Sequence, residues 1–196
     1  MKGILARKIG MTRVLCPETG QMTPVTVCEV PEANVLQVKT MENDGYSALV
    51  LGSFERKNFG KNENRKYKFI QELALDGSED FKRGDSVSLD RMKEVSVVKV
   101  TGLSRGRGFS GVIKRHNFSR GPETHGSHHH REPGSVGMCA KPARILKGKK
   151  LPGQYGAKRV TTLNLKVMQI DTNNKLIALK GALPGAKNGF LFIRER

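Results

Sequence analysis

A stretch of sixty residues, 101–160, limits most strongly what this chain can fold into. It carries 13 Lys and Arg against 2 acidic residues, together with all 5 histidines and 11 of the 22 glycines. Only 16 of its 60 residues are apolar, compared with 56 of the 136 residues that flank it. Burying so little apolar surface does not offset the conformational entropy that the segment loses when it becomes ordered. We therefore expect the segment to need a partner that neutralises its charge.

The flanking residues carry much less charge. Residues 1–100 have a net charge of +2 and residues 161–196 of +4, within a total of +17. A chain with this excess of positive charge is expected to bind a polyanion. Nucleic acid is the first candidate, and an anionic membrane surface is the second. The flanks hold enough apolar residues for a core. We therefore predict that 1–101 and 161–196 form one globular domain, with 102–160 as a basic extension.

The sequence also bears on the compartment. No apolar run approaches the roughly 18–20 residues that span a bilayer. Four basic residues within the first 13 positions interrupt any signal-peptide core. Cys16, Cys28 and Cys139 lie far apart, which favours free thiols in a reducing compartment over a disulfide framework. We expect a cytoplasmic protein.

Both flanks have the pattern of short β-strands separated by Pro, Gly, Asn and Asp. Strands are expected at 22–30, 33–40, 46–54, 67–75, 86–90, 95–101, 163–167, 176–180 and 190–194. Residues 61–74 also fit a helix, because Tyr67, Ile70 and Ala74 fall at helical spacing, but we prefer a strand. In the basic extension no window is long enough for a stable helix. The pattern predicts a mainly β protein, built as a barrel or a sandwich.

Two glycine motifs in the extension resemble nucleotide-binding loops superficially. Residues 106–111 match GxGxxG, but the glycines and Pro122 that follow leave no room for the helix of a dinucleotide fold. Gly148 and Lys149 are followed by Lys150, where a phosphate-binding loop needs Ser or Thr. We therefore predict no cofactor.

A histidine cluster is the main alternative signal in the extension. His125, His128, His129 and His130, with Cys139, have the donor atoms that bind transition metals. Their spacing does not match a structural zinc site, and three consecutive side chains converge on one ion only at a sharp turn. We prefer imidazoles that hydrogen-bond to RNA phosphates and 2′-hydroxyl groups, and we predict no metal.

The extension offers no catalytic arrangement. Its two carboxylates, Glu123 and Glu132, have no partner suited to acid–base chemistry, and serines near histidines in sequence do not define a triad. We therefore predict that the chain is not an enzyme, with no catalytic residue and no small-molecule substrate.

The same residues suit an RNA backbone. Arginine binds phosphate oxygens with two parallel hydrogen bonds, lysine acts as a point charge, and glycine lets the backbone approach a polyanion closely. The predicted RNA-binding residues are Arg105, Arg107, Lys114, Arg115, His116, Arg120, His125, His128, Arg131, Arg144, Lys147, Lys149, Lys150, Lys158 and Arg159.

Aromatic residues in the extension allow two interpretations. The side chains of Phe109, Phe118 and Tyr155 can stack on unpaired bases, as aromatic side chains do in RNA-binding proteins that tolerate many sequences. Alternatively they anchor the extension to other parts of the protein. The sequence leaves both interpretations open.

Six segments follow one another along the chain: GILARKIGMTRV (3–14), KVTGLSRGRGFSGVIKRHNF (99–118), THGSHHHREPGSVG (124–137), LKGKKLPGQYG (146–156), RVTTLNLKVMQI (159–170) and KGALPGAKNGFLFIR (180–194). Together, in this order, they resemble the ribosomal protein L3 family at its bacterial length. The resemblance covers essentially the whole chain and is far more specific than any single motif.

The resemblance implies a translation-protein-type β-barrel with a long non-globular extension that enters the large ribosomal subunit. It also implies binding to 23S ribosomal RNA near its 3′ end, early in assembly, beside the ribosomal proteins L14 and L19. The tip of the extension, 134–144, would approach the peptidyl transferase centre. Its leading residues would be Gly134, Ser135, Val136, Gly137, Met138, Cys139 and Ala140.

The chain departs from the family pattern at two places. Ala140 stands where many bacterial members have a glutamine that is methylated in some lineages, so we do not predict that modification. The run from His128 to His130 is richer in histidine than the usual pattern. A free-standing RNA chaperone or translation factor with a basic loop is the alternative function, and it would bind many RNAs with little preference.

Overall fold

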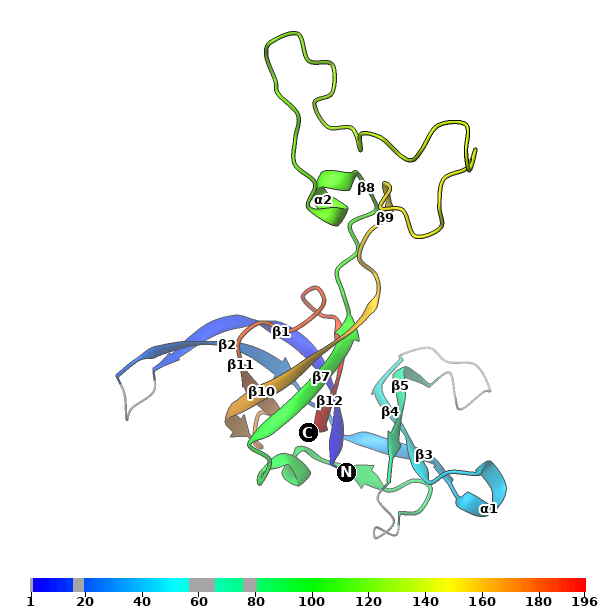
Figure 1. Cartoon of the computed structure of the whole chain (residues 1–196). Coiled ribbons are helices and arrows are strands. Elements are labelled where there is room, and N and C mark those ends of the chain that lie inside the picture. Colours follow the sequence, from blue (N-terminus) through cyan, green and yellow to red (C-terminus); the bar gives the residue numbers. More distant parts are fainter. Residues whose placement is uncertain (1, 16–19, 57–65, 76–80) are drawn as a thin grey trace. The chain divides into compact units, whose positions relative to one another are not determined.

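The structure is a computed structural model that describes residues 2–15, 20–56, 66–75 and 81–196 (Figure 1). These residues divide into two units. The first consists of Met1–Ser104 and Arg159–Arg196, and the second of Arg105–Lys158. We call the second unit the arm, and each unit is described by itself.

Six antiparallel strands of the first unit form a closed barrel. Around the barrel they are β1 (Gly3–Leu15), β12 (Phe190–Glu195), β7 (Val97–Leu103), β10 (Arg159–Asp171), β11 (Leu176–Lys180) and β2 (Met22–Glu29), which returns to β1. Gly3 pairs with Arg194, so the two ends of the chain lie on neighbouring strands (Figure 1). The barrel therefore depends on contacts between the most distant parts of the sequence.

The interior of the barrel is filled by every second side chain along its strands. Successive residues of a strand point to opposite faces. In β12, Leu191 and Ile193 therefore join the core cluster of the barrel, whereas Phe192 between them joins a second cluster. The barrel cluster also includes Ile4, Ala6, Val98, Val100, Ile177 and Leu179.

A separate four-stranded sheet packs against the outside of the barrel. Its strands lie in the order β5 (Tyr67–Ala74), β4 (Ala48–Glu55), β3 (Ala33–Lys39) and β6 (Ser86–Val87). Leu5 and Phe192 of the barrel strands share a buried cluster with residues of this sheet, namely Ala33, Val35, Leu49, Leu51, Leu73 and Val87. Apolar contacts on the outer face of β1 and β12 thus join the two sheets.

The helices of the described residues are short. They are α1 (Met41–Asp44), the 3-10 helix η2 (Leu89–Met92) and α2 (Val112–His116). Gly45 ends α1 with a φ of 77°, in the left-handed region that glycine adopts without strain. Within the described ranges, none of these helices has the length and apolar character needed to cross a membrane.

The observed elements confirm a mainly β chain and correct several details. The strand preferred over a helix is present at Tyr67–Ala74, while residues 61–65 of that prediction lie outside the described ranges. The strand expected at 86–90 ends at Val87, and η2 follows it. The strands between Ala33 and Val87 do not enter the barrel, because β3, β4 and β5 pair with one another as successive hairpins.

Burial in the barrel makes one thiol unreactive. Burial raises the pKa of the Cys28 thiol to about 12, although Lys8 opposes the shift, whereas Cys139 is exposed on the arm. Because the thiolate is the nucleophile, iodoacetamide at pH 8 is expected to alkylate Cys139 and spare Cys28 in the folded chain. Peptide-level mass spectrometry reports each cysteine separately, including Cys16, which lies outside the described residues. Alkylation of Cys28 as fast as Cys139, without denaturant, would contradict the burial.

Candidate RNA-binding arm

The base of the arm is a short paired segment, which we call the neck (residues 105–116 and 151–158). In it, β8 (Phe109–Ser110) pairs with β9 (Gly153–Gln154). The backbone N–H of Arg107 donates to the carbonyl of Tyr155 (N···O 2.9 Å), and the N–H of Tyr155 donates to the carbonyl of Gly108 (3.0 Å). These bonds hold the outgoing and returning chains together.

Helix α2 is fixed to the returning chain by two basic side chains. The Arg115 guanidinium donates to the carbonyl oxygen of Leu151 (Nη1···O 2.6 Å), and Nε2 of His116 lies 3.1 Å from the same oxygen. The buried side chain of Val112 adds an apolar contact surface on α2. This helix has five residues, in a segment where the sequence predicted none. Its contacts with the returning chain compensate for its short length.

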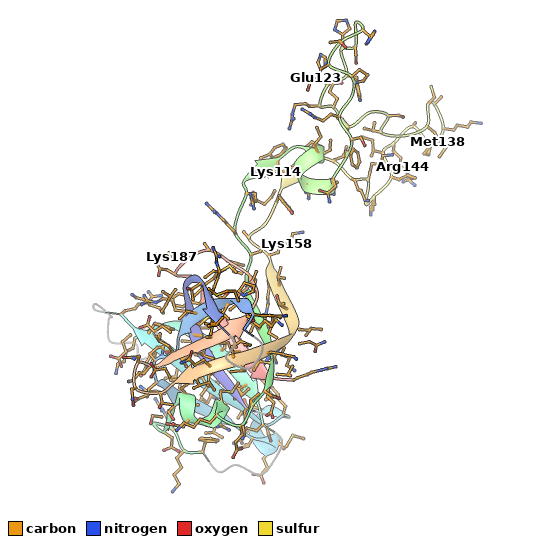
Figure 2. The ribbon with its side chains drawn as sticks, turned by 90° about the vertical axis from the view of Figure 1, so that its left-hand side faces the viewer. Lys114, Glu123, Met138, Arg144, Lys158 and Lys187 are labelled. Carbon is orange, nitrogen blue, oxygen red and sulfur yellow. The ribbon has the colours of Figure 1, made fainter. Side chains whose placement is uncertain are left out.

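Beyond the neck, the arm is extended and highly exposed. Every residue from Gly134 to Lys150 is exposed, and the side chains of Met138 and Arg144 stand out from the backbone (Figure 2). Between the neck and this stretch, the N–H of Gly121 donates to the carbonyl of His130 (3.1 Å). The tip residues predicted from the family resemblance all lie in the exposed stretch.

Most of the predicted RNA-binding side chains are exposed to solvent. Thirteen of the fifteen are exposed: Arg105, Arg107, Lys114, Arg120, His125, His128, Arg131, Arg144, Lys147, Lys149, Lys150, Lys158 and Arg159. Arg115 and His116 are half-buried and bind Leu151. Arg120 also forms an ion pair with Glu123 (3.0 Å), but both groups are exposed, and such pairs are weak in water. The arm therefore presents many cations with little internal neutralisation.

The histidines of the arm do not converge. His130 makes a hydrogen bond to the carbonyl of Pro122 (2.9 Å from Nδ1), and Nδ1 of His129 lies 3.2 Å from a carboxylate oxygen of Glu132. Across residues 2–15, 20–56, 66–75 and 81–196, no three His, Cys, Asp or Glu side chains form a group that could hold a metal ion. The imidazoles of His129 and His130 instead make separate local contacts.

The three aromatic residues of the arm differ in their surroundings. The side chain of Phe109 is 80% exposed, and that of Tyr155 is 39% exposed. Phe118 is half-buried, with its ring centroid 6.1 Å from that of His116. Only for Phe118 does the geometry favour the anchoring interpretation.

Sequence reasoning missed the groups that order the neck. The carbonyl of Leu151 accepts from two side chains, and a Cβ on Gly156 would overlap the carbonyl oxygen of Arg105. A backbone carbonyl has no signature in the sequence. The glycine at 156 does carry a signal, since glycine is the residue that tolerates a positive φ and a close backbone approach.

The fold and the arm together define a mainly β protein with an extended cationic arm suited to a polyanion. The family model described as Ribosomal protein L3 matches residues 74–184. The large ribosomal subunit protein uL3 of Thermosipho africanus (strain TCF52B) is 43% identical over 202 aligned residues, covering 99% of this chain and 98% of that protein. The chain belongs to the ribosomal protein L3 family.

Proposed function

We propose that the chain is a structural, non-catalytic constituent of the large ribosomal subunit in the cytoplasm. It binds 23S ribosomal RNA near its 3′ end and supports early assembly of the subunit. The observation that carries this proposal is the arm, where thirteen predicted RNA-binding side chains are exposed in or beside an extended chain. Because the chain belongs to the ribosomal protein L3 family, ribosomal RNA is the polyanion that we expect the arm to bind.

In this proposal the two units have different roles. The barrel, of the translation-protein type, is a folded base with its own core. The arm enters the RNA, where its Lys and Arg side chains neutralise converging phosphates and release bound counterions. Arg115 and His116 act differently from the other basic residues, because they keep α2 against Leu151 and so shape the neck.

The exposed tip, residues 134–144 with Gly134 to Ala140 at its start, approaches the peptidyl transferase centre and shapes nearby nucleotides, while peptide bond formation belongs to the RNA. The neighbouring proteins in the proposed setting are L14 and L19. These finer statements extend the family resemblance, and the complete exposure of the tip supports them because it leaves the tip free for a partner.

The test replaces the arm by a short linker. Leu103 pairs with Arg159 across β7 and β10, so a tight turn between these strands can close the barrel without the arm. We expect the shortened chain to keep its circular dichroism spectrum and cooperative unfolding. It should bind a 3′-end fragment of 23S RNA more weakly. The slope of log K against log salt is negative, and its magnitude should decrease by about 0.9 for each phosphate that the shortened chain no longer neutralises, as on duplex DNA.

An unrelated structured RNA is the control for specificity. Preference of the full chain for the ribosomal fragment supports the ribosomal role. Equal binding to both RNAs would favour an RNA chaperone, and an unchanged affinity after removal of the arm would show that the charge of the arm is not used for RNA.

A further inference from the structure

Phe109 is an aromatic side chain without a place in the protein core. It is 80% exposed, the highest value among the large apolar residues of the described ranges. Within the same ranges, no aromatic ring stacks on it and no cation lies over its face. Its ring is therefore open to a ligand from outside the chain.

The backbone that carries this ring is held in place. Arg107 and Gly108, which precede Phe109, are bonded to Tyr155 across the neck at 2.9 and 3.0 Å. Ser110, which follows it, is buried, and its hydroxyl donates to the carbonyl of Arg107 (3.2 Å). An aromatic ring on such a backbone loses little conformational entropy when a ligand stacks on it, because two χ angles alone remain to be ordered.

The surroundings of the ring suit a nucleotide better than a protein surface. Arg105 and Arg107, four and two residues before it in the chain, are exposed, and residues 105–122 contain no acidic side chain. A Cβ built on Gly108 or on Gly111 would meet no atom within 4 Å other than those of its chain neighbours, so the backbone on both sides of the exposed ring is uncrowded. Phosphates can therefore reach the arginines while a base lies on the ring. An apolar protein surface would instead have to bury cations without partners, which is costly.

We propose that Phe109 is a stacking site for an unpaired nucleobase of the RNA that the arm binds. The inference rests on the proposed function and assigns a distinct role to one side chain in it. Bases stack on aromatic side chains without need of sequence readout. The stacking contact adds affinity that does not depend on counterion release, so salt should weaken it little.

The absence of tryptophan from the chain allows a direct test. In the full chain, Phe109→Trp introduces a single indole at an exposed position. Its fluorescence is expected to be quenched when a 3′-end fragment of 23S RNA is added, because stacked bases quench indole emission. Phe118→Trp is the matched control in the same arm, and its half-buried indole should respond much less.

Affinities of two further variants complete the test. Phe109→Ala should weaken binding by about 5- to 150-fold, the range for removal of one base–aromatic stack, with the salt slope unchanged. Phe109→Leu keeps an apolar side chain but has no π-face, so it should resemble the alanine variant.

The outcomes separate this inference from the proposed function. If the unaltered chain does not prefer the 23S fragment, the proposed function fails and the inference fails with it. If the unaltered chain shows that preference while Phe109→Ala binds equally well and Phe109→Trp is not quenched, the stacking site alone is overturned. A variant that binds the RNA normally but enters the subunit poorly would assign Phe109 to a neighbouring protein, which also overturns it.

Discussion

Replacing Phe192 by alanine is expected to lower the free energy of unfolding of the barrel unit by about 3–5 kcal/mol, the range for truncating a buried phenylalanine. Phe192 is 2% exposed and lies in the cluster that joins the barrel to the four-stranded sheet. It pairs with Leu5 on one side and Thr101 on the other, so the backbone around it is fixed and cannot collapse easily into the space left. This is a large loss, because the total free energy of unfolding of most domains is only about 5–15 kcal/mol.

Guanidinium unfolding followed by circular dichroism measures this destabilisation. Phe109→Ala is the matched control, because it removes the same atoms from a side chain that is 80% exposed. Its effect should stay within about 0.5 kcal/mol, as for most surface substitutions. Equal destabilisation by the two variants would mean that Phe192 does not hold the two sheets together.

Local chemistry makes many strand positions predictable. The turn after β10 illustrates this, because the carboxylate of Asp171 accepts hydrogen bonds from the backbone N–H (3.1 Å) and the side-chain amide (2.7 Å) of Asn174. Asp and Asn three residues apart are visible in the sequence, and Asx turns of this kind are a known property of these residues. The strand from Leu176 to Lys180 that follows was accordingly predictable from its apolar run.

The choice of partner strands was not predictable in the same way. The pairing of Gly3 with Arg194 joins the two ends of the chain, and no local pattern carries that information. Likewise, nothing in the composition of β3, β4 and β5 separates them from barrel strands. Even within β12, the neighbours Leu191 and Phe192 enter different core clusters, so composition alone does not tell which sheet a buried side chain will contact.

The basic arm shows the same division between local and distant information. Charge is a local property, so the cationic character of the arm follows from composition. Arg115 and Arg120 have the same side chain, yet the first binds a carbonyl 36 residues away and the second is exposed. Because every residue carries a carbonyl, the sequence could not distinguish an arginine that orders the neck from one that remains available to RNA.

Gly156 is the point at which the neck is least tolerant of a side chain. Its φ of +72° lies in the left-handed region, and an added Cβ would overlap the carbonyl oxygen of Arg105. Both problems involve the backbone, so rotation of a side chain cannot relieve them. The residue before it, Tyr155, makes two backbone hydrogen bonds that help to join the neck, next to the pairing of β8 with β9. A side chain at 156 is therefore expected to break the pairing of the neck.

We expect Gly156→Ala to weaken binding of the 23S fragment by about tenfold or more, because the overlap with the Arg105 carbonyl adds to left-handed strain, which alone costs roughly 1–3 kcal/mol. Hydrogen exchange should show faster exchange of the Arg107 and Tyr155 amides, while unfolding of the barrel stays unchanged. Gly148→Ala is the matched control, since its φ is +81° but an added Cβ would meet no atom within 4 Å. A larger effect at 156 than at 148 identifies the overlap with Arg105 as the cause. Full protection of the Tyr155 amide in Gly156→Ala would instead mean that the neck adapts, and that the arm does not depend on this close approach.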